Sequence, residues 1–290
     1  MTLVNYLQLN PVVFLIFCTL IGLSVGSFLN VVAHRLPVML DRDWKSQCRE
    51  LLEIKEEAEQ PAFNLSHPPS RCPKCERPIR IRENIPVISF LLLRGRCAGC
   101  SEPISLRYPM VEGFTGLLSL TVAWHFGVSW EAAAALSLTW ALIALSLIDF
   151  DHQILPDSIV LPMLWLGLLL SLFGIFVDAE AAIVGAVAGY LSLWSVFQLF
   201  KLITGKQGMG YGDFKLLALF GAWLGWQSLF QIILISSVVG AVVGLMLILF
   251  MGRDRSIPIP FGPYLATAGW ISLLWGEQIN RGYLQLAGLA

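Results

Sequence analysis

Two aspartates lie where apolar sequence meets polar sequence, and carboxylates in such places commonly carry out chemistry. Asp149 ends the apolar run Ala132–Ile148, and Asp213 lies in the segment Gly210–Phe214, just before another apolar run. A carboxylate at the edge of a membrane span is costly unless it faces water or a partner, and such residues usually mark a function. Two aspartates that share one site can divide the work, one ionised and one protonated. The pair therefore predicts a dyad that activates water for peptide hydrolysis without a covalent intermediate.

The sequence around each aspartate does not settle which acid pairs with Asp213 or what role the glycines have. Asp151 and Asp157 follow Asp149 closely, and spacing alone does not select among the three acids. Glycines on either side of Tyr211 let backbone or substrate approach Asp213 closely. The same glycines would also suit a simple tight turn.

An ion transporter is the competing function, because acids within a membrane commonly relay protons or cations. Against it, the acids gather at one end of the apolar runs instead of continuing through them. The alternative hypothesis remains a proton- or cation-coupled membrane transporter, with a structural zinc module formed by the cysteines described next.

A second group of residues has the spacing of a metal site. Two Cys-x-x-Cys pairs, 72–75 and 97–100, are separated by 21 residues, close to the spacing of four-thiolate zinc sites. The predicted zinc ligands are Cys72, Cys75, Cys97 and Cys100. Four sulfurs close the coordination sphere of tetrahedral zinc, so the site should organise the fold. Cys18 and Cys48 have no partner at ligand spacing and are interpreted as free thiols.

Composition places these sites in a polytopic membrane protein. Hydrophobic residues make up 56% of the 290 residues and charged residues only 13%, and the mean hydropathy is +0.71. We expect an all-α fold of about eight transmembrane helices, because most of the apolar runs approach the roughly 20 residues that cross a bilayer. The expected spans are Val12–Val32, Tyr108–Phe126, Ala132–Ile148, Ser158–Val177, Ala181–Ile203, Phe214–Gly225, Ser228–Met251 and Ile257–Trp275. The expected domains are an N-terminal transmembrane anchor (1–32), a cytoplasmic loop with a zinc subdomain (33–107) and a helical membrane domain (108–290).

The basic residues predict the orientation. Thirteen of the 19 Lys and Arg residues lie in the segment Ala33–Arg107. By the positive-inside rule this segment is cytoplasmic, and with eight spans both termini face the outer side of the membrane and both aspartates lie on the cytoplasmic side. The polar stretch Asp41–Gln60 is spaced for a short amphipathic spacer helix. Since orientation already explains the arginines and stacking aromatics are scarce there, nucleic acid is not an expected partner.

Several ordered motifs together resemble the type IV prepilin peptidases, bacterial inner-membrane aspartic proteases of the Gly-x-Gly-Asp type. The resemblance runs nearly end to end. Its motifs are Gly26–Val32, His34–Pro37, the two cysteine pairs, Glu83–Ser89, Arg107–Pro109 with Glu112, Asp149–His152, Leu155–Asp157 and Gly208–Lys215. The cysteine module indicates the bifunctional form, which is also an N-methyltransferase.

The resemblance implies the reaction and the partners. Members of the family cleave the leader of prepilins and type II secretion pseudopilins after a glycine at the cytoplasmic face. They then methylate the new terminal amine, usually that of a phenylalanine, with S-adenosylmethionine. Among the three candidate acids the family pattern selects Asp149, paired with Asp213. No motif places the methyl donor; the segment Asn84–Arg96 is our hypothesis, because it adjoins the zinc ligands.

Overall fold

The computed structural model describes residues 3–54, 62–206, 208–251 and 259–286. These residues form two compact units, Met1–Val128 and Ser129–Ala290. Both units are built from helices, and no β-strand occurs among the described residues. The predicted all-α class is thus confirmed.

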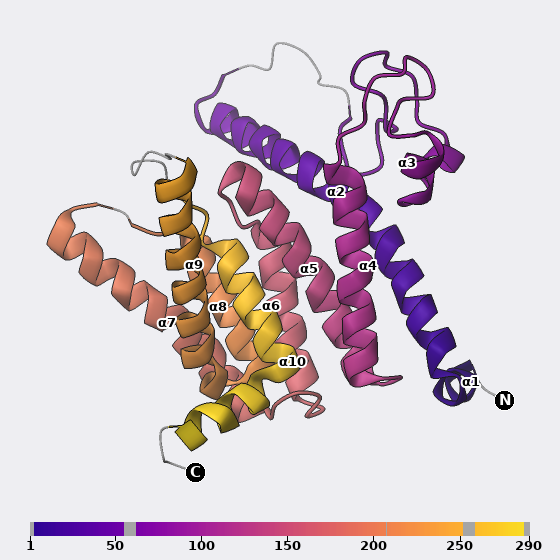
Figure 1. Ribbon diagram of the computed structural model, residues 1–290. Coiled ribbons are helices and arrows are strands. Elements are labelled where there is room, and N and C mark those ends of the chain that lie inside the picture. Colours follow the sequence, from indigo (N-terminus) through magenta and orange to yellow (C-terminus); the bar gives the residue numbers. More distant parts are fainter. Residues whose placement is uncertain (1–2, 55–61, 207, 252–258, 287–290) are drawn as a thin grey trace. The chain divides into compact units, whose positions relative to one another are not determined.

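The first unit is built on two long helices that run side by side (Figure 1). Its helices are α1 (Leu3–Leu9), α2 (Pro11–Leu51), the 3-10 turn η1 (Ile81–Asn84), α3 (Ile88–Leu92) and α4 (Arg107–Phe126). Small residues let α2 and α4 approach closely. A Cβ on Gly22 would lie 2.4 Å from Oγ of Ser119, and one on Gly26 would lie 2.8 Å from Cα of Glu112. Such contacts are typical of helices that pack within a membrane.

Helix α2 is longer than the expected first span. It continues without a break from the apolar run Val12–Val32 through the charged residues to Leu51. Loss of hydropathy did not end the helix, because charged residues such as Lys, Arg and Glu are good helix formers. The predicted spacer helix is therefore, up to Leu51, the last part of α2. Residues 52–54 are not helical, and residues 55–60 of that prediction lie outside the described residues.

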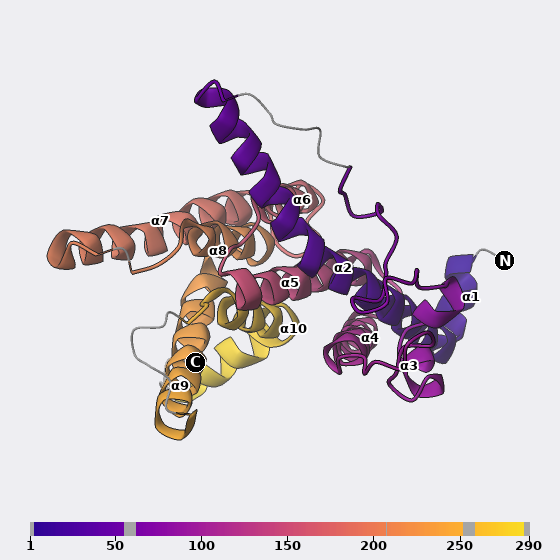
Figure 2. The same ribbon diagram turned by 90° about the horizontal axis from the view of Figure 1, so that it is seen from above.

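The second unit surrounds a short, buried helix. Its elements are α5 (Trp130–His152), α6 (Asp157–Ser171), α7 (Ala179–Thr204), α8 (Tyr211–Leu224), η2 (Trp226–Ser228), α9 (Leu229–Met251) and α10 (Gly262–Leu286). Nearly every side chain of α8 from Asp213 to Trp223 is buried, among α6, α7 and α10. Figure 2 shows α7 and α8 lying alongside each other. Their backbones approach so closely that a Cβ on Gly221 would lie 2.0 Å from the carbonyl oxygen of Gly185.

Among the described residues, four helices are long and apolar enough to cross a membrane. They are Pro11–Leu51, Trp130–His152, Ala179–Thr204 and Trp226–Phe250. The expected number of about eight spans is therefore not confirmed, although a helix overlaps each expected range. Helix α8 spans 14 residues, about 21 Å, which is short of the hydrocarbon thickness.

Candidate functional site

Asp149 lies in the last turn of α5. Gln153 ends the helix in the left-handed conformation, and its N–H donates to the carbonyl oxygen of Asp149 over 2.9 Å. The side chain of Asp149 is buried, with only 5% of the residue exposed. Its Oδ2 accepts a hydrogen bond from the backbone N–H of Gly262 over 3.0 Å. The end of α5 thus places a buried carboxylate against the first residue of α10.

Asp213 lies in the first turn of α8. Gly210 precedes the helix in an extended conformation, and its carbonyl oxygen accepts from the N–H of Asp213 over 3.3 Å. Only 7% of Asp213 is exposed, and the residue lies close enough to Asp149 for the two charges to interact. A negative side chain in a first turn is also favoured by the helix dipole. Two carboxylates that are 64 residues apart in sequence therefore share one buried region of the second unit.

The side chain of Leu155 packs against a glycine close to each of the two aspartates. Leu155, in the loop between α5 and α6, packs against Gly212: a Cβ there would lie 2.7 Å from Cβ of Leu155. The same side chain packs against Gly262, where a Cβ would lie 3.1 Å from its Cδ2. Gly212, which precedes Asp213, and Gly262, which donates to Asp149, therefore both leave the space that Leu155 occupies.

The two rival acids are placed differently. Asp151 is exposed at the end of α5. Asp157 is also exposed and pairs with Lys215 of α8, whose Nζ lies 2.7 Å from each carboxylate oxygen. Burial and proximity to Asp213 therefore distinguish Asp149 from its neighbours.

Sequence reasoning missed Gly262. It follows Phe261 and precedes Pro263, a segment that was interpreted only as part of the last span. A glycine beside a proline commonly marks a turn, and that signal was present. Gly262 and Asp149 are 113 positions apart in the sequence, so local sequence patterns do not reveal their contact.

The four predicted zinc ligands come together in the first unit. Their sulfur atoms all lie within 4.8 Å of one another, with Sγ of Cys72 3.8 Å from that of Cys100 and Sγ of Cys75 4.0 Å from that of Cys97. Zinc–sulfur bonds of about 2.3 Å in a tetrahedron place the sulfurs about 3.8 Å apart. The cluster thus has the dimensions of a four-thiolate zinc site.

Two equivalent turns carry the ligands. The sequence Arg-Cys-x-x-Cys-x-x-Pro begins at Arg71 and recurs 25 residues later at Arg96. Each turn is closed by the same bonds, since the N–H of Glu76 donates to the carbonyl of Cys72 and that of Ser101 to the carbonyl of Cys97. Each copy also ends in an isolated β-bridge to its proline. The module is therefore a pair of matching knuckles, a repeat that the cysteine spacing contains but that sequence reasoning did not use.

Backbone donors favour the thiolate at one cysteine of each knuckle. The N–H groups of Cys75 and Lys74 lower the pKa of the Cys72 thiol to about 6. Those of Cys100 and Gly99 lower the pKa of Cys97. At Cys100 the backbone N–H of Glu102 acts in the same direction, but burial and the three neighbouring thiols outweigh it and raise the pKa to about 11. Because zinc binds thiolates, the donors at Cys72 and Cys97 suit the metal.

Two buried charged residues attach the segment that carries the four cysteines to the two long helices. Arg35 of α2 donates from its guanidinium to the carbonyl oxygens of Asn64, at 2.9 Å, and Pro68, at 2.6 Å. Glu112 of α4 accepts the N–H of Val87 over 2.7 Å, and Val87 has a φ of 59°. A β-branched residue rarely adopts a positive φ, so this bond holds a strained turn just before α3.

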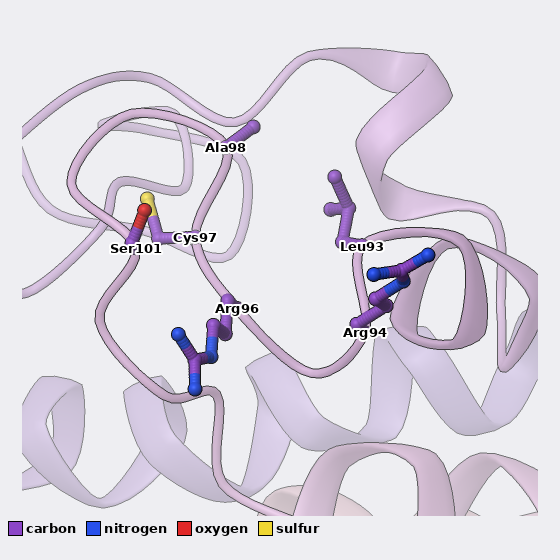
Figure 3. Close-up of a pocket in the computed structure, with 6 residues that line it drawn as sticks. All are labelled: Leu93, Arg94, Arg96, Cys97, Ala98 and Ser101. Carbon is purple, nitrogen blue, oxygen red and sulfur yellow. The ribbon is translucent and has the colours of Figure 1, made fainter.

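A cavity of about 570 Å³ opens beside the second knuckle. It is lined by Leu93, Arg94, Arg96, Cys97, Ala98 and Ser101. Figure 3 shows Leu93 and Arg94 on one side of this cavity and Cys97 with Ser101 on the other. The two arginines make it suitable for a ligand that carries an anionic group.

Two models of peptidase A24 domains match the chain, one in each part of the sequence. Residues 20–126 match the family model for the bacterial peptidase A24 N-terminal domain, and residues 136–245 match that for the type IV leader peptidase family. No solved structure matches the chain.

Curated relatives with the name prepilin leader peptidase/N-methyltransferase match nearly the whole chain. The protein from Stutzerimonas stutzeri is 60% identical over the full length of both chains. That from Pseudomonas aeruginosa is 58% identical over 99% of each chain, and that from Aeromonas hydrophila is 56% identical over 91% of this chain and 92% of the relative. These identities extend across both units, and the chain belongs to the type IV leader peptidase family.

Proposed function

We propose that the chain is a bifunctional membrane enzyme, an aspartic endopeptidase and N-methyltransferase. It removes the leader of type IV prepilins and type II secretion pseudopilins after a glycine, and it methylates the new N-terminal residue, usually phenylalanine. The observation that carries this proposal is the pair of buried, neighbouring carboxylates, Asp149 and Asp213, in a chain of this family. The family relation favours a peptidase over the alternative, an ion transporter.

The chemistry of cleavage follows from two acids that hold one proton. The ionised aspartate takes a proton from water, whose oxygen attacks the carbonyl carbon of the glycine. The protonated aspartate hydrogen-bonds the carbonyl oxygen as negative charge develops there. When the carbon–nitrogen bond breaks, the departing nitrogen takes up the proton that the first aspartate accepted from water, and it leaves as an amine. Burial strengthens each of these interactions, because the electrostatic screening is weaker than in water.

Zinc has a structural role in this proposal. The residues that would hold it are Cys72, Cys75, Cys97 and Cys100, whose spacing fits a closed tetrahedral site. With four protein sulfurs there is no open position for water or substrate. The metal would instead fix the two knuckles to each other, next to the ion pair of Lys74 with Glu102 that also joins them.

The cavity beside the second knuckle is our candidate for the methyl-donor site. Its lining overlaps the predicted segment Asn84–Arg96 at Leu93, Arg94 and Arg96. Its volume lies within the range of cofactor sites, about 300–1,000 Å³. Either guanidinium is suited to the carboxylate of S-adenosylmethionine, which supplies a methyl group activated by the positive charge on its sulfur. The chain itself needs only to hold this donor near an uncharged terminal amine.

The membrane arrangement extends the proposal. Four apolar helices support a membrane protein, and the basic segment Ala33–Arg107 favours the cytoplasmic face for the zinc module. We propose a multi-pass protein of the bacterial inner membrane with both termini periplasmic. The partners would be the prepilin and pseudopilin substrates and the lipid bilayer.

A single incubation tests the whole proposal. Purified protein in detergent is mixed with a prepilin and isotopically labelled S-adenosylmethionine, and the products are weighed by mass spectrometry. We expect a pilin that has lost its leader and gained one labelled methyl group. An intact prepilin under these conditions contradicts the peptidase, and a cleaved pilin without label contradicts the methyltransferase.

A further inference from the structure

Position 262 is closed to every side chain. The N–H of Gly262 points at Oδ2 of Asp149 over 3.0 Å, within a buried hydrogen bond. A Cβ at this position would lie 2.6 Å from that same oxygen and 3.2 Å from the carboxyl carbon. Real Cβ atoms do not approach other atoms to 2.6 Å, so even alanine would displace the carboxylate or the start of α10.

Leu155 fills the space on the other side of Gly262. Its Cδ2 would lie 3.1 Å from a Cβ on Gly262, and its Cβ would lie 2.7 Å from a Cβ on Gly212. Gly212 immediately precedes Asp213 in the first turn of α8. Leu155 therefore packs at once against the residue that holds Asp149 and the residue that adjoins Asp213.

We infer that Gly262 and Leu155 are positioning residues, which set the place and orientation of Asp149 relative to Asp213. This inference rests on the proposed peptidase function. The N–H of Gly262 fixes one oxygen of Asp149, which leaves the other oxygen for water or the shared proton. Leu155 acts as a spacer between the loop after α5 and the first turn of α8. Neither residue needs to touch the substrate to do this.

The expected effect is on turnover, since the dyad is displaced while the substrate-binding surface stays. A displacement of about 1 Å in a catalytic group commonly costs about 100-fold in rate. We expect Gly262→Ala to lower kcat for prepilin cleavage about 100-fold with little change in KM. Leu155→Ala should lower kcat about tenfold, and Leu155→Met should restore most of it, because methionine has nearly the volume of leucine.

Gly282→Ala is the matched control. Gly282 lies on the same helix, and a Cβ there would meet no atom of the described residues within 4 Å. Kinetics of leader release and thermal unfolding are measured for the wild type and each variant, with Asp149→Asn as the inactive reference. Loss of kcat in Gly262→Ala at an unchanged unfolding temperature supports the inference. Cleavage by Gly262→Ala equal to that by Gly282→Ala overturns it.

Two further outcomes separate the inference from the function on which it rests. If Gly262→Ala does not fold, the Leu155 variants decide: equal kcat in Leu155→Ala and Leu155→Met overturns the positioning role, and rescue by methionine alone supports it. If the wild type cleaves and Asp149→Asn does not, the peptidase proposal stands whatever these variants do. Failure of the wild type to cleave contradicts the proposed function itself.

Discussion

Nζ of Lys215 lies 2.7 Å from both carboxylate oxygens of Asp157, which joins the start of α6 to the first turns of α8. Lys215 is two residues beyond Asp213 on the same helix. Its positive charge, and the negative charge of Asp157, are therefore balanced within their own ion pair. Asp157 is thus an ion-pair partner at an exposed position, with 53% of its side chain accessible.

The rival acids should therefore matter little for cleavage. We expect Asp157→Asn and Asp151→Asn to keep prepilin cleavage within a fewfold of the wild type. Loss of the exposed Asp157 pair should cost about 0–1 kcal/mol of stability, as is usual for such pairs. Rates of leader release for the purified variants check this. Inactivation by Asp151→Asn with retained activity in Asp149→Asn would show that the dyad is wrongly assigned.

The site could be predicted from the sequence only in part. Residue types and the ends of apolar runs pointed to Asp213 and to a group of three acids, Asp149, Asp151 and Asp157, which lie within nine residues and have nearly the same local pattern. Only the family resemblance selected Asp149 among them. Only the turn at Gln153 and the approach of α10 make one of them buried. The contact with Gly262 depends on the packing of helices that are distant in sequence, and periodicity carries no information about it.

The zinc ligands were predictable because their geometry is local. Each Cys-x-x-Cys turn fixes two sulfurs by short-range hydrogen bonds. The spacing of the two pairs then predicted the cluster of Cys72, Cys75, Cys97 and Cys100, whose sulfurs lie within 4.8 Å of one another. Helix ends were less predictable. The polarity of residues 33–51 suggested a break after Val32, whereas helix propensity continued α2 to Leu51.

Metal content should follow the four cysteines and no others. Cys97→Ser should lose bound zinc and weaken both activities, because folding of the module is coupled to metal binding. Cys48→Ser is the matched control, since Cys48 is an exposed thiol outside the cluster. Elemental analysis of the purified proteins measures the zinc. Full zinc content in Cys97→Ser, or none in the wild type, is incompatible with a four-thiolate site.

The two arginines of the cavity should affect the methyl donor selectively. Arg94→Ala and Arg96→Ala should each raise the KM for S-adenosylmethionine by roughly 10- to 100-fold, because one charge-assisted hydrogen bond contributes about 1.5–3 kcal/mol. Cleavage of prepilin should stay near the wild-type rate. Arg82→Ala, an exposed arginine outside the cavity lining, is the control. An unchanged donor KM in both cavity variants would remove the donor from this cavity.

Close packing of α7 on α8 should make Gly221 intolerant of substitution. A Cβ there would lie 2.0 Å from the carbonyl oxygen of Gly185, so Gly221→Ala must separate the helices and should cost about 1–3 kcal/mol. Gly113→Ala should be neutral or stabilising, because a Cβ at that helical position meets nothing within 4 Å in the part of the chain that the structure describes. Thermal unfolding in detergent compares the two. Equal stability of both variants would contradict the close approach.

The two activities should separate at the aspartates. Methyl transfer to an amine needs a positioned donor and an uncharged nitrogen, and neither requires a carboxylate dyad. Asp213→Asn should therefore still methylate a pre-cleaved pilin that begins with phenylalanine. Transfer of label from S-adenosylmethionine to this substrate measures it. Loss of methylation in a folded Asp213→Asn protein would point to one shared active centre.

Cleavage of a prepilin by Asp149→Asn and Asp213→Asn, followed by mass spectrometry, is the decisive measurement for the dyad. An amide keeps the shape of the carboxylate but does not exchange its proton, so each variant should lose on the order of a thousandfold in cleavage rate, as residues that act as a unit do. Both should remain folded and inserted in the membrane, and the leader should stay attached to the substrate. Release of the leader at near wild-type rate by either variant would contradict catalysis by Asp149 and Asp213.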